Sequence, residues 1–532
     1  MNTTTDKRPG RRFGLPPWLS IDNIWVQRVL GLALAIAVGF FLGDQISKPQ
    51  GRVIKGLVGI FVLYAAWRFP IPISLAAFVL LFPYPFPTVY ASSNTIFVFL
   101  ITAMWLAQIG LRTARPAGRT MLDLPILLLM GVYLLSFNAV TYAEQLKFGL
   151  INLSTILASI FVFYLIVSAV RDEETLKRMM KIITIMSITC WLTAIWELVF
   201  PGRAIIPGWI LSGAYYNPEA IERGLRVGGP FQDFELFAEF NAMLLPVMIF
   251  QAARAEDRKQ RLFFLGLVLL NFFTLMATVT RGATIALFAG MLYMLFLLRK
   301  TTPIKTLAIV AGLAIIVFSV VEFYLSNFTV SGSVLDRLLG TKMVNGMPDS
   351  RTFWPDILAR ALEKPWVGHG PYYEFGEPGR EKLKRFFWPH NGYLYYLHTV
   401  GILGTAAFLW MLFRMLAGSF KDSIHKLDSA DYPSSLLFAW HVSLVIFMID
   451  QLKIEYLRSQ YYQFWPWIVF GMLVATWNVV RSRAPVPRPY HPRLGSPVHR
   501  VRRSGRIPLV PVPPPADNGG IPSVAAPGGV DR

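Results

Sequence analysis

Charged residues are scarce in this chain. Only 15% of its 532 residues are Asp, Glu, Lys or Arg and 54% are hydrophobic, whereas a soluble domain carries about 25% charged residues. The apolar residues come in blocks, many of them as long as the ~17–25 residues with which a helix crosses a bilayer. The shorter, alternating segments of a transmembrane barrel are missing. The composition therefore predicts an all-α polytopic membrane protein.

Cysteine and the common metal and nucleophile motifs are also nearly absent. The single cysteine, Cys190, lies in an apolar block, so no disulfide can form within the chain. The sequence has no CxxC pair, no HExxH, no P-loop and no GxSxG. Asp44 is the only aspartate in the first loop expected outside the membrane, so this loop holds no aspartate pair. We therefore expect neither a metal nor another cofactor.

Acidic residues are outnumbered, which gives the chain a formal net charge of +20. Such a charge is common in nucleic-acid-binding proteins, but most of the short basic runs here lie beside apolar blocks. Lys and Arg mark the cytoplasmic ends of membrane helices. We therefore expect the charge to set the orientation in the membrane, and we expect no nucleic-acid partner.

The lengths of the apolar runs predict about fourteen membrane spans. The third is short and flanked by proline, so a total of about twelve or thirteen is also compatible with the pattern. The predicted spans lie near residues 29–43, 53–67, 71–83, 95–111, 122–140, 148–170, 182–200, 236–253, 262–279, 282–298, 304–325, 393–415, 433–449 and 463–480.

Basic residues orient these spans. If the N-terminus is cytoplasmic, the short cytoplasmic loops hold RTARPAGR, RDEETLKRMMK, RAEDRKQR and RKTTPIK, whereas the periplasmic loop YPFPTVYASSN has no basic residue. An even number of spans then places both termini in the cytoplasm. A basic segment before an apolar run also begins a signal peptide. Here the small residues of GLALAIAVG lie inside the run, which favours an uncleaved first span.

The spans divide the chain into seven parts. Two long periplasmic loops stand out, because long loops in compact proteins usually carry function. The tail is rich in Pro, Arg and Gly and is predicted to be disordered; its basic part either contacts anionic lipid headgroups or is simply solvated. The parts are a cytoplasmic N-terminus 1–28, membrane helices 29–200, a loop 201–235, membrane helices 236–325, a larger loop 326–392, membrane helices 393–480 and the tail 481–532.

Arg281 and Arg226 are candidate anion-binding residues. Arg281 lies between two apolar spans with almost no loop, where a charge is costly and usually functional. The alternative is an arginine that reaches out to the lipid headgroups. Its small neighbours Thr280, Gly282 and Ala283 favour function, since they leave room for a ligand. Arg226 precedes a predicted Gly-Gly-Pro turn, and its alternative role is that of an ordinary loop cation.

The larger loop supplies Arg351 and His390. Residues 351–363 have the spacing of an amphipathic helix with Arg351 at its start. His390 lies where this loop meets the next span, and a histidine that titrates at about pH 6.5 can accept a proton at neutral pH. Either residue could instead have a structural role at a helix start. His369, between two glycines, and His398, inside a predicted span, are weaker candidates.

Four segments together resemble the O-antigen ligase and O-antigen polymerase superfamily of bacterial inner-membrane glycosyltransferases. The resemblance covers roughly residues 220–420. It departs at FQDFELFAEF, where such proteins more often have a Pro-Asn pair, which leaves the roles of Gln232 and Asp233 open. The segments are R-x-G-G-P-F at 226–231, T-R-G-A at 280–283, the stretch from Arg351 to the P-x-x-G-x-G that ends at Gly370, and H-N-x-Y-L…G-x-x-G from His390 to Gly404.

The resemblance implies an all-helical, GT-C-like enzyme that transfers a glycan from a polyprenyl diphosphate carrier at the periplasmic face without a metal. The residues suit this chemistry. Arg226, Arg281 and Arg351 would bind the diphosphate, because arginine is always charged and grips phosphate oxygens two at a time. Arg281 would also stabilise the leaving group. His390 would take the proton of the acceptor hydroxyl, and attack from the opposite face would invert the anomeric centre.

The implied partners are the polyprenyl diphosphate-linked glycan, a growing glycan or lipid A–core as acceptor, membrane lipids, and other polysaccharide export or assembly proteins. We favour polymerisation of O-antigen or exopolysaccharide, with ligation to lipid A–core or to a protein as the alternative. A solute transporter would place its polar groups at mid-bilayer in broken helices of matching halves, whereas the candidates here gather at the outer face. A scaffold without catalysis would leave Arg281 unexplained.

The predicted orientation can be tested by cysteine labelling. In a Cys190→Ala background, Ser333→Cys lies in the larger loop and should react with a membrane-impermeant maleimide in cells whose inner membrane is intact. Labelling that requires the inner membrane to be opened would contradict the orientation.

Overall fold

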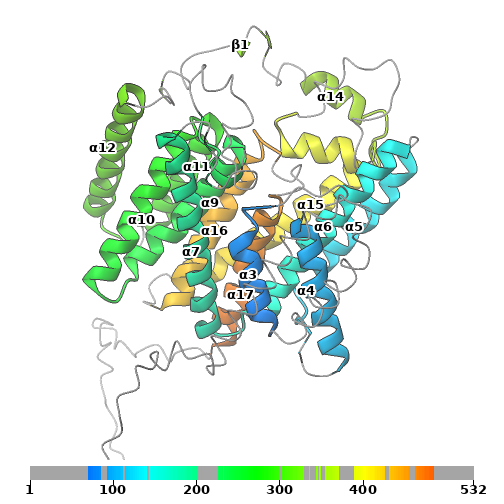
Figure 1. Ribbon diagram of the computed structural model, residues 1–532, viewed down its shortest axis with the longest axis horizontal. Helices are drawn as coiled ribbons and strands as arrows, with labels where there is room; N and C mark the ends of the chain where they lie inside the picture. The colour runs from blue at the N-terminus through cyan, green and yellow to red at the C-terminus, as the bar shows by residue number, and fades with distance from the viewer. Residues whose placement is uncertain are drawn as a thin grey trace, which may run out of the picture. The chain divides into compact units, whose positions relative to one another are not determined.

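The chain divides into two units, Met1–Arg483 and Ala484–Arg532, and the helices lie in the first (Figure 1). The second unit, which holds all but the first three residues of the predicted tail, and the first two predicted spans lie outside the described residues. The computed structural model describes residues 70–85, 93–111, 114, 116–140, 143–200, 203, 205, 226–231, 233–299, 302–328, 335, 343–344, 347–348, 354–370, 389–425, 431–455 and 462–483.

The described part of the first unit is built from helices, which confirms the all-α prediction. Twelve long helices coincide with the last twelve predicted spans. They are α3 (Ile71–Leu81), α4 (Ser93–Gly110), α5 (Asp123–Ser136), α6 (Ala143–Ala169), α7 (Glu173–Val199), α9 (Phe234–Ala253), α10 (Arg258–Ala277), α11 (Arg281–Leu298), α12 (Ile304–Phe328), α15 (Gly392–His425), α16 (Tyr432–Asp450) and α17 (Phe464–Ser482).

Shorter elements connect them. The short helix α14 (Trp354–Ala361) lies within residues 351–363, where the sequence predicts an amphipathic helix. Two-residue strands β1 (Met343–Val344) and β2 (Met347–Pro348) pair antiparallel, with Met343 opposite Pro348. The 3-10 helices are η2 (Phe137–Ala139) after α5 and η4 (Gly229–Phe231) before α9.

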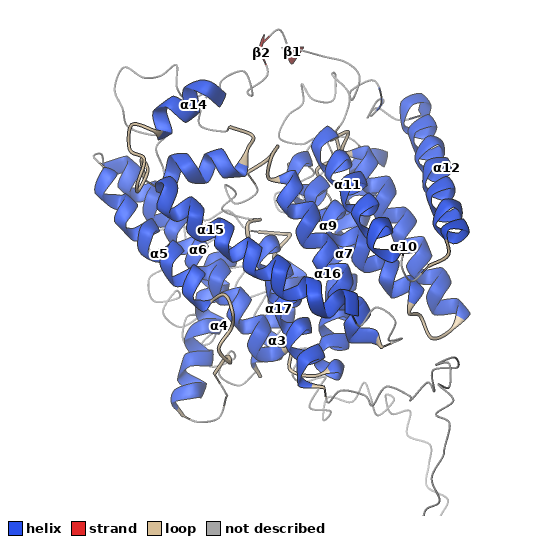
Figure 2. Cartoon of the chain, turned by 180° about the vertical axis from the view of Figure 1, so that it is seen from behind, coloured by secondary structure: helices blue, strands red, loops and turns tan. Residues whose placement is uncertain are grey.

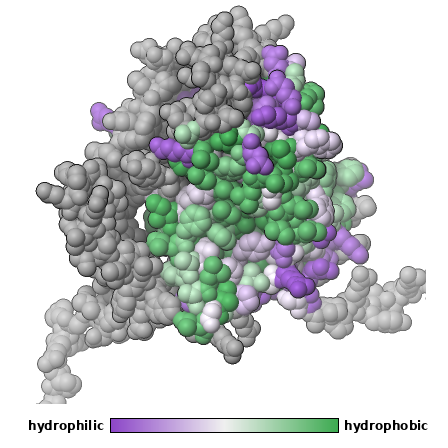
Figure 3. Space-filling model, turned by 90° about the vertical axis from the view of Figure 1, so that its right-hand side faces the viewer, coloured by the Kyte–Doolittle hydropathy of each residue, from purple (hydrophilic) through white to green (hydrophobic). Residues whose placement is uncertain are grey.

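The helices have the length and surface of membrane spans. Among the described residues, eight helices are long and apolar enough to cross a bilayer, and three shorter apolar helices accompany them. One face of the molecule shows a broad hydrophobic band with hydrophilic residues above and below it (Figure 3). On α5 alone, Leu124, Leu127 and Leu134 are each more than half exposed. Such side chains are stable against lipid, so the protein is a polytopic membrane protein.

Aspartates start four of the helices. Asp172, Asp233, Asp257 and Asp431 precede α7, α9, α10 and α16, and each side chain accepts a backbone N–H of the first turn. These bonds satisfy groups that a helix start would otherwise leave unpaired. The role left open for Asp233 is therefore that of an N-cap.

Packing of α9 between α10, α16 and η4 forms the centre of the bundle. The side chain of Phe231 stacks on Tyr462, with ring centroids 4.7 Å apart, and Phe240 contacts Trp465 at 4.7 Å. All four rings are almost fully buried. The aromatic core therefore fixes the segment that carries Arg226 against α9 and the start of α17.

Ion pairs gather at the end of the bundle where α17 ends and where α7 and α16 begin. Arg483 pairs with Glu173 and with Asp431, and Arg481 pairs with Asp422. This end holds the basic loops that the sequence assigns to the cytoplasm. We call the other end, where α9, α11 and α15 begin and α10 and α16 end, the outer end.

The structure breaks α15 at Gly401, where the sequence predicts one continuous span at 393–415. Gly401 has φ 65° and ψ −167°, which separates two helical parts, and the parts run in different directions (Figure 2). In an unbroken helix the N–H groups of Ile402 and Leu403 would bond to the carbonyls of His398 and Thr399. The break leaves all four groups without those partners.

Residues 365–370 satisfy the groups that the break releases. Ile402 and Leu403 donate to the carbonyls of Pro365 and Trp366 at 2.7 and 3.3 Å. The carbonyls of His398 and Thr399 accept from the N–H groups of His369 and Gly370 at 2.8 and 3.0 Å. The missed break is thus a tertiary effect, because its stability depends on a loop segment 29 to 37 residues earlier in the chain.

Gly401→Ala should destabilise the protein. Added at Gly401, a Cβ would lie 2.5 Å from the carbonyl carbon and oxygen of Trp366, and the backbone conformation is nearly restricted to glycine, which adds about 1–3 kcal/mol of strain. We expect a lower melting temperature of the purified protein in detergent. Gly131→Ala on α5, where a Cβ meets nothing within 4 Å, is the matched control and should melt at or above the wild-type temperature. Equal melting of wild type and Gly401→Ala would contradict the interleaved bonding.

Candidate active site at the outer end

Arg226 fastens the segment before η4 to the turn between α10 and α11. Its Nε donates to the carbonyl of Thr278 at 3.1 Å, and Nη2 donates to the carbonyl of Val279 at 3.3 Å and to Thr280 Oγ1 at 3.1 Å. The guanidinium also lies 3.2 Å above the centre of the Phe234 ring. Arg226 therefore has a structural role besides any role in ligand binding, and it lies directly beside the start of α11.

The glycines after Arg226 bring their backbone against a buried carboxylate. The N–H groups of Gly228 and Gly229 donate to Glu197 Oε2 at 3.1 and 2.8 Å. Gly229 has φ 53°, a conformation that favours glycine. The carbonyl of Pro230 accepts from Tyr462 Oη at 2.8 Å. These contacts explain why R-x-G-G-P-F has this composition.

Arg281 is the first residue of α11, and the segment that follows α16 packs against the next residue, Gly282. The stem of Lys453 occupies the space beside Gly282, because a Cβ on Gly282 would lie 1.5 Å from Lys453 Cδ. The small neighbours of Arg281 thus leave room for the side chain of Lys453, and not only for a ligand. Through Thr280 the structure brings Arg281 and Arg226 together.

His390 lies in a turn held from three sides. The carbonyl of Pro389 accepts from Trp354 Nε1 at 2.7 Å, Asn391 Nδ2 donates to the carbonyl of Leu452 at 3.2 Å, and the N–H of Gly392 donates to the carbonyl of Gln451 at 2.7 Å. The His390 side chain is 31% exposed. The imidazole is therefore fixed by its backbone and still accessible from outside.

Backbone strain coincides with this region. Among the residues that the structure describes, Val279 and His390 are the non-glycine residues with positive φ, at 48° and 47°. Such conformations are uncommon, and they persist where the surroundings enforce them, often at functional sites. Val279 presents its carbonyl to Arg226, and His390 is itself the predicted base.

Glu235 and Lys453 belong to the same cluster, and the sequence analysis missed both. Glu235 Oε2 lies 3.3 Å from His390 Nδ1, and Glu235 Oε1 lies 3.8 Å from Lys453 Nζ. Glu235 lies in the first turn of α9 and Lys453 follows the end of α16, so their approach depends on tertiary packing. The departure at FQDFELFAEF was the one available signal, because it places two carboxylates at a predicted helix start.

A buried polar layer lies behind this cluster. Gln451 Nε2 donates to Glu239 Oε1 at 2.8 Å. Glu239, Asp450 and Gln451 are each almost fully buried. Polar groups inside a membrane protein are costly and are usually functional, so the layer marks the outer end as the polar centre of the bundle.

The remaining sequence candidates have different outcomes. Arg351 lies outside the described residues, so its place relative to His390 stays a prediction. His369 Nε2 bonds to the carbonyl of Arg360 at 2.8 Å, and its ring stacks on His398 at 4.8 Å. Burial lowers the pKa of His369. Both histidines support the break in α15, in agreement with their weaker standing as catalytic candidates.

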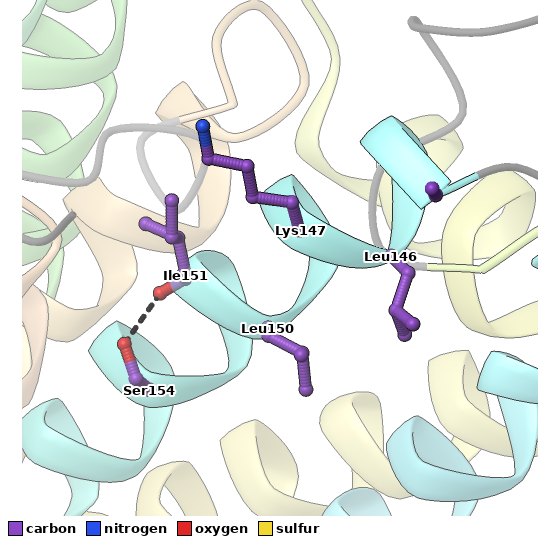
Figure 4. Close-up of a pocket in the computed structure, with 6 residues that line it drawn as sticks. Leu146, Lys147, Leu150, Ile151 and Ser154 are labelled. Atoms are coloured by element: carbon purple, nitrogen blue, oxygen red, sulfur yellow. Dashed lines mark hydrogen bonds between the residues drawn. The ribbon is translucent and has the colours of Figure 1, made fainter. Parts of the chain in front are cut away.

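A separate pocket of about 470 Å³ lies along the first turns of α6. Figure 4 shows Leu146, Leu150 and Ile151 around it, with Lys147 and Ser154 as polar members. The hydroxyl of Ser154 donates to the carbonyl of Ile151 at 2.7 Å. None of the predicted site residues is among the described residues that line this pocket, so it is distinct from the cluster around His390.

Comparison with known proteins supports the superfamily resemblance. A family model described as O-antigen ligase matches residues 266–409, a stretch from α10 to α15 that includes Arg281, Arg351 and His390 and excludes Arg226. No curated protein matches the chain. The match confirms, over these residues, the predicted resemblance to the O-antigen ligase and polymerase superfamily.

Fold and family match together define the class of the protein. The helices are those of a multi-pass membrane protein, and the family match over residues 266–409 indicates similarity to enzymes with an O-antigen ligase or polymerase type of function in polysaccharide assembly. The matching family implies a glycan donor and a lipid-linked or lipid A–core acceptor in a membrane.

Proposed function

We propose that the protein transfers a glycan from a polyprenyl diphosphate carrier to a sugar hydroxyl of the acceptor, at the periplasmic face. The observation that carries this proposal is the convergence of three helix starts at the outer end. They bring a partly exposed histidine, a carboxylate and several cations into one cluster. The approach of Glu235 to His390 and to Lys453 defines it.

The chemistry needs a base and a way to stabilise the leaving group. His390 accepts the proton of the acceptor hydroxyl, whose oxygen forms a bond to the anomeric carbon as the bond to the diphosphate oxygen breaks. The electron pair of that bond leaves with the polyprenyl diphosphate. Fixed cations stabilise the developing charge best, because they need no reorganisation during the reaction.

Arg281 is the leading candidate for this cation, with Arg226 and Arg351 as further diphosphate ligands. Arg281 begins α11, and the N-terminus of a helix itself favours an anion through its dipole and its N–H groups. Arg226 bonds to Thr280, which is the residue directly before Arg281. Arg226 therefore both positions the start of α11 and adds positive charge beside it.

Polymerisation of O-antigen or exopolysaccharide is our preferred reaction, on the ground of the length of the loop at residues 326–392. Ligation to lipid A–core or protein is the second candidate, favoured by the description of the matching family model. The surface glycans of a deletion strain separate the two. A polymerase defect leaves a single repeat unit on the lipopolysaccharide or removes a separate exopolysaccharide, whereas a ligase defect removes all long chains from the lipopolysaccharide.

His390→Ala should nearly abolish glycan transfer, because a positioned base contributes about 10²–10⁴-fold to rate. The measurement is transfer from a purified polyprenyl diphosphate glycan, with the membrane level of each variant equalised first. His369→Ala is the control histidine, and it should lose far less activity per folded molecule because its contacts support the break in α15. A wild-type rate for His390→Ala would remove His390 from catalysis.

A further inference from the structure

Glu235 lies between the imidazole of His390 and the ammonium group of Lys453. Its side chain is 14% exposed, and its two carboxylate oxygens face different partners, His390 Nδ1 at 3.3 Å and Lys453 Nζ at 3.8 Å. The N–H of Glu235 donates to Asp233 Oδ1 at 2.8 Å, so the N-cap of α9 fixes its backbone. The carboxylate therefore lies at a defined place between an imidazole and an ammonium.

The partners of Glu235 are also fixed. Lys453 lies against Gly282 at the start of α11, where an added Cβ would force the Lys453 stem to move. His390 is held in its strained backbone conformation by the contacts of Pro389, Asn391 and Gly392. Three elements distant in sequence thus produce one row of side chains, which runs from His390 through Glu235 to Lys453.

We propose that Glu235 is the positioning residue of the base. It holds Nδ1 of His390, so that Nε2 is directed at the acceptor hydroxyl, and Lys453 balances the charge of the carboxylate beside Arg281. This role rests on the proposed function. It also gives a reason for the second carboxylate of FQDFELFAEF, the point at which the sequence departs from the superfamily pattern.

The proposed step is balanced in protons and electrons. The proton of the acceptor hydroxyl passes to Nε2 of His390 while the hydroxyl oxygen bonds to the anomeric carbon and the diphosphate departs with the bonding electrons. The imidazolium that forms faces the carboxylate of Glu235, and an opposite charge at this distance favours the protonated imidazole. Bulk solvent then removes the proton.

Other charged groups contribute to the field at His390. Lys453 comes from the segment after α16, Arg281 from the start of α11, and Asp450 and Glu239 from the buried layer behind them. The cations oppose protonation of the imidazole and the carboxylates favour it. Glu235 is the carboxylate that the structure places next to the ring itself, so its removal should have a directed effect on the pH dependence.

Glu235→Gln keeps the size of the side chain and removes its charge. In the purified full-length protein, we expect kcat for glycan transfer to fall about 10²-fold through loss of positioning, with the KM for the donor nearly unchanged. Because His390 must be neutral to act as a base, the rate falls on the acid side of the pH profile. Loss of the carboxylate should shift this acid limb to lower pH. Glu174→Gln, an exposed carboxylate paired with Arg178 on α7, is the matched control and should behave as wild type.

Further variants keep the test decisive. Glu235→Asp retains the charge and should keep the acid limb in place with an intermediate kcat, even where Glu235→Gln folds poorly. In a His390→Ala background, Glu235→Gln should cause no further loss, since the two residues act as one unit. An unshifted acid limb in Glu235→Gln, with kcat either unchanged or reduced only in proportion to folded protein, would overturn the positioning role while leaving the proposed function intact. A wild-type rate for His390→Ala would instead overturn the proposed function.

Discussion

The segment that follows α16 is the contact on which the outer end depends. Within a few residues it accepts the N–H of Gly392, bonds to Glu239 through Gln451, and lays the stem of Lys453 against Gly282. Polar backbone and side-chain groups inside a membrane protein must find partners within the protein. This segment provides them for α15, α9 and α11 at once, and so it sets the distance between His390 and the arginines.

Glycines make these close approaches possible, and many residues of the superfamily motifs serve the packing of the helices. Gly282 admits Lys453, Gly368 and Gly401 let residues 365–370 interleave with α15, and Gly229 lets the backbone reach Glu197. Glycines thus lie beside Arg226, Arg281 and His390 at the packed positions of the outer end. A motif residue without reactive chemistry can thus be as necessary to the site as the base itself.

The sequence predicted the fold well, because membrane spans are encoded locally by run length and the twelve helices from α3 to α17 that coincide with predicted spans follow such runs. It also predicted that Arg226, Arg281 and Arg351 line one cavity, which stays a prediction, although Arg226 bonds to Thr280, the residue before Arg281. It did not predict the break at Gly401, the hydrogen bonds from Arg226 to backbone carbonyls, or the cluster that Glu235 and Lys453 form with His390. All three depend on segments far apart in the chain, whose contacts leave no periodic pattern in the sequence. The catalytic roles themselves stay predictions.

The central claim is that one cluster at the outer end holds the diphosphate and the acceptor together. An experimental structure of the protein with a non-transferable phosphonate analogue of the polyprenyl diphosphate glycan tests it most directly. The account predicts phosphate oxygens in contact with the guanidinium of Arg281 at the start of α11, with the anomeric carbon facing Nε2 of His390. A diphosphate bound elsewhere, such as in the pocket beside Lys147 on α6, with no contact to Arg281 or His390, would contradict it.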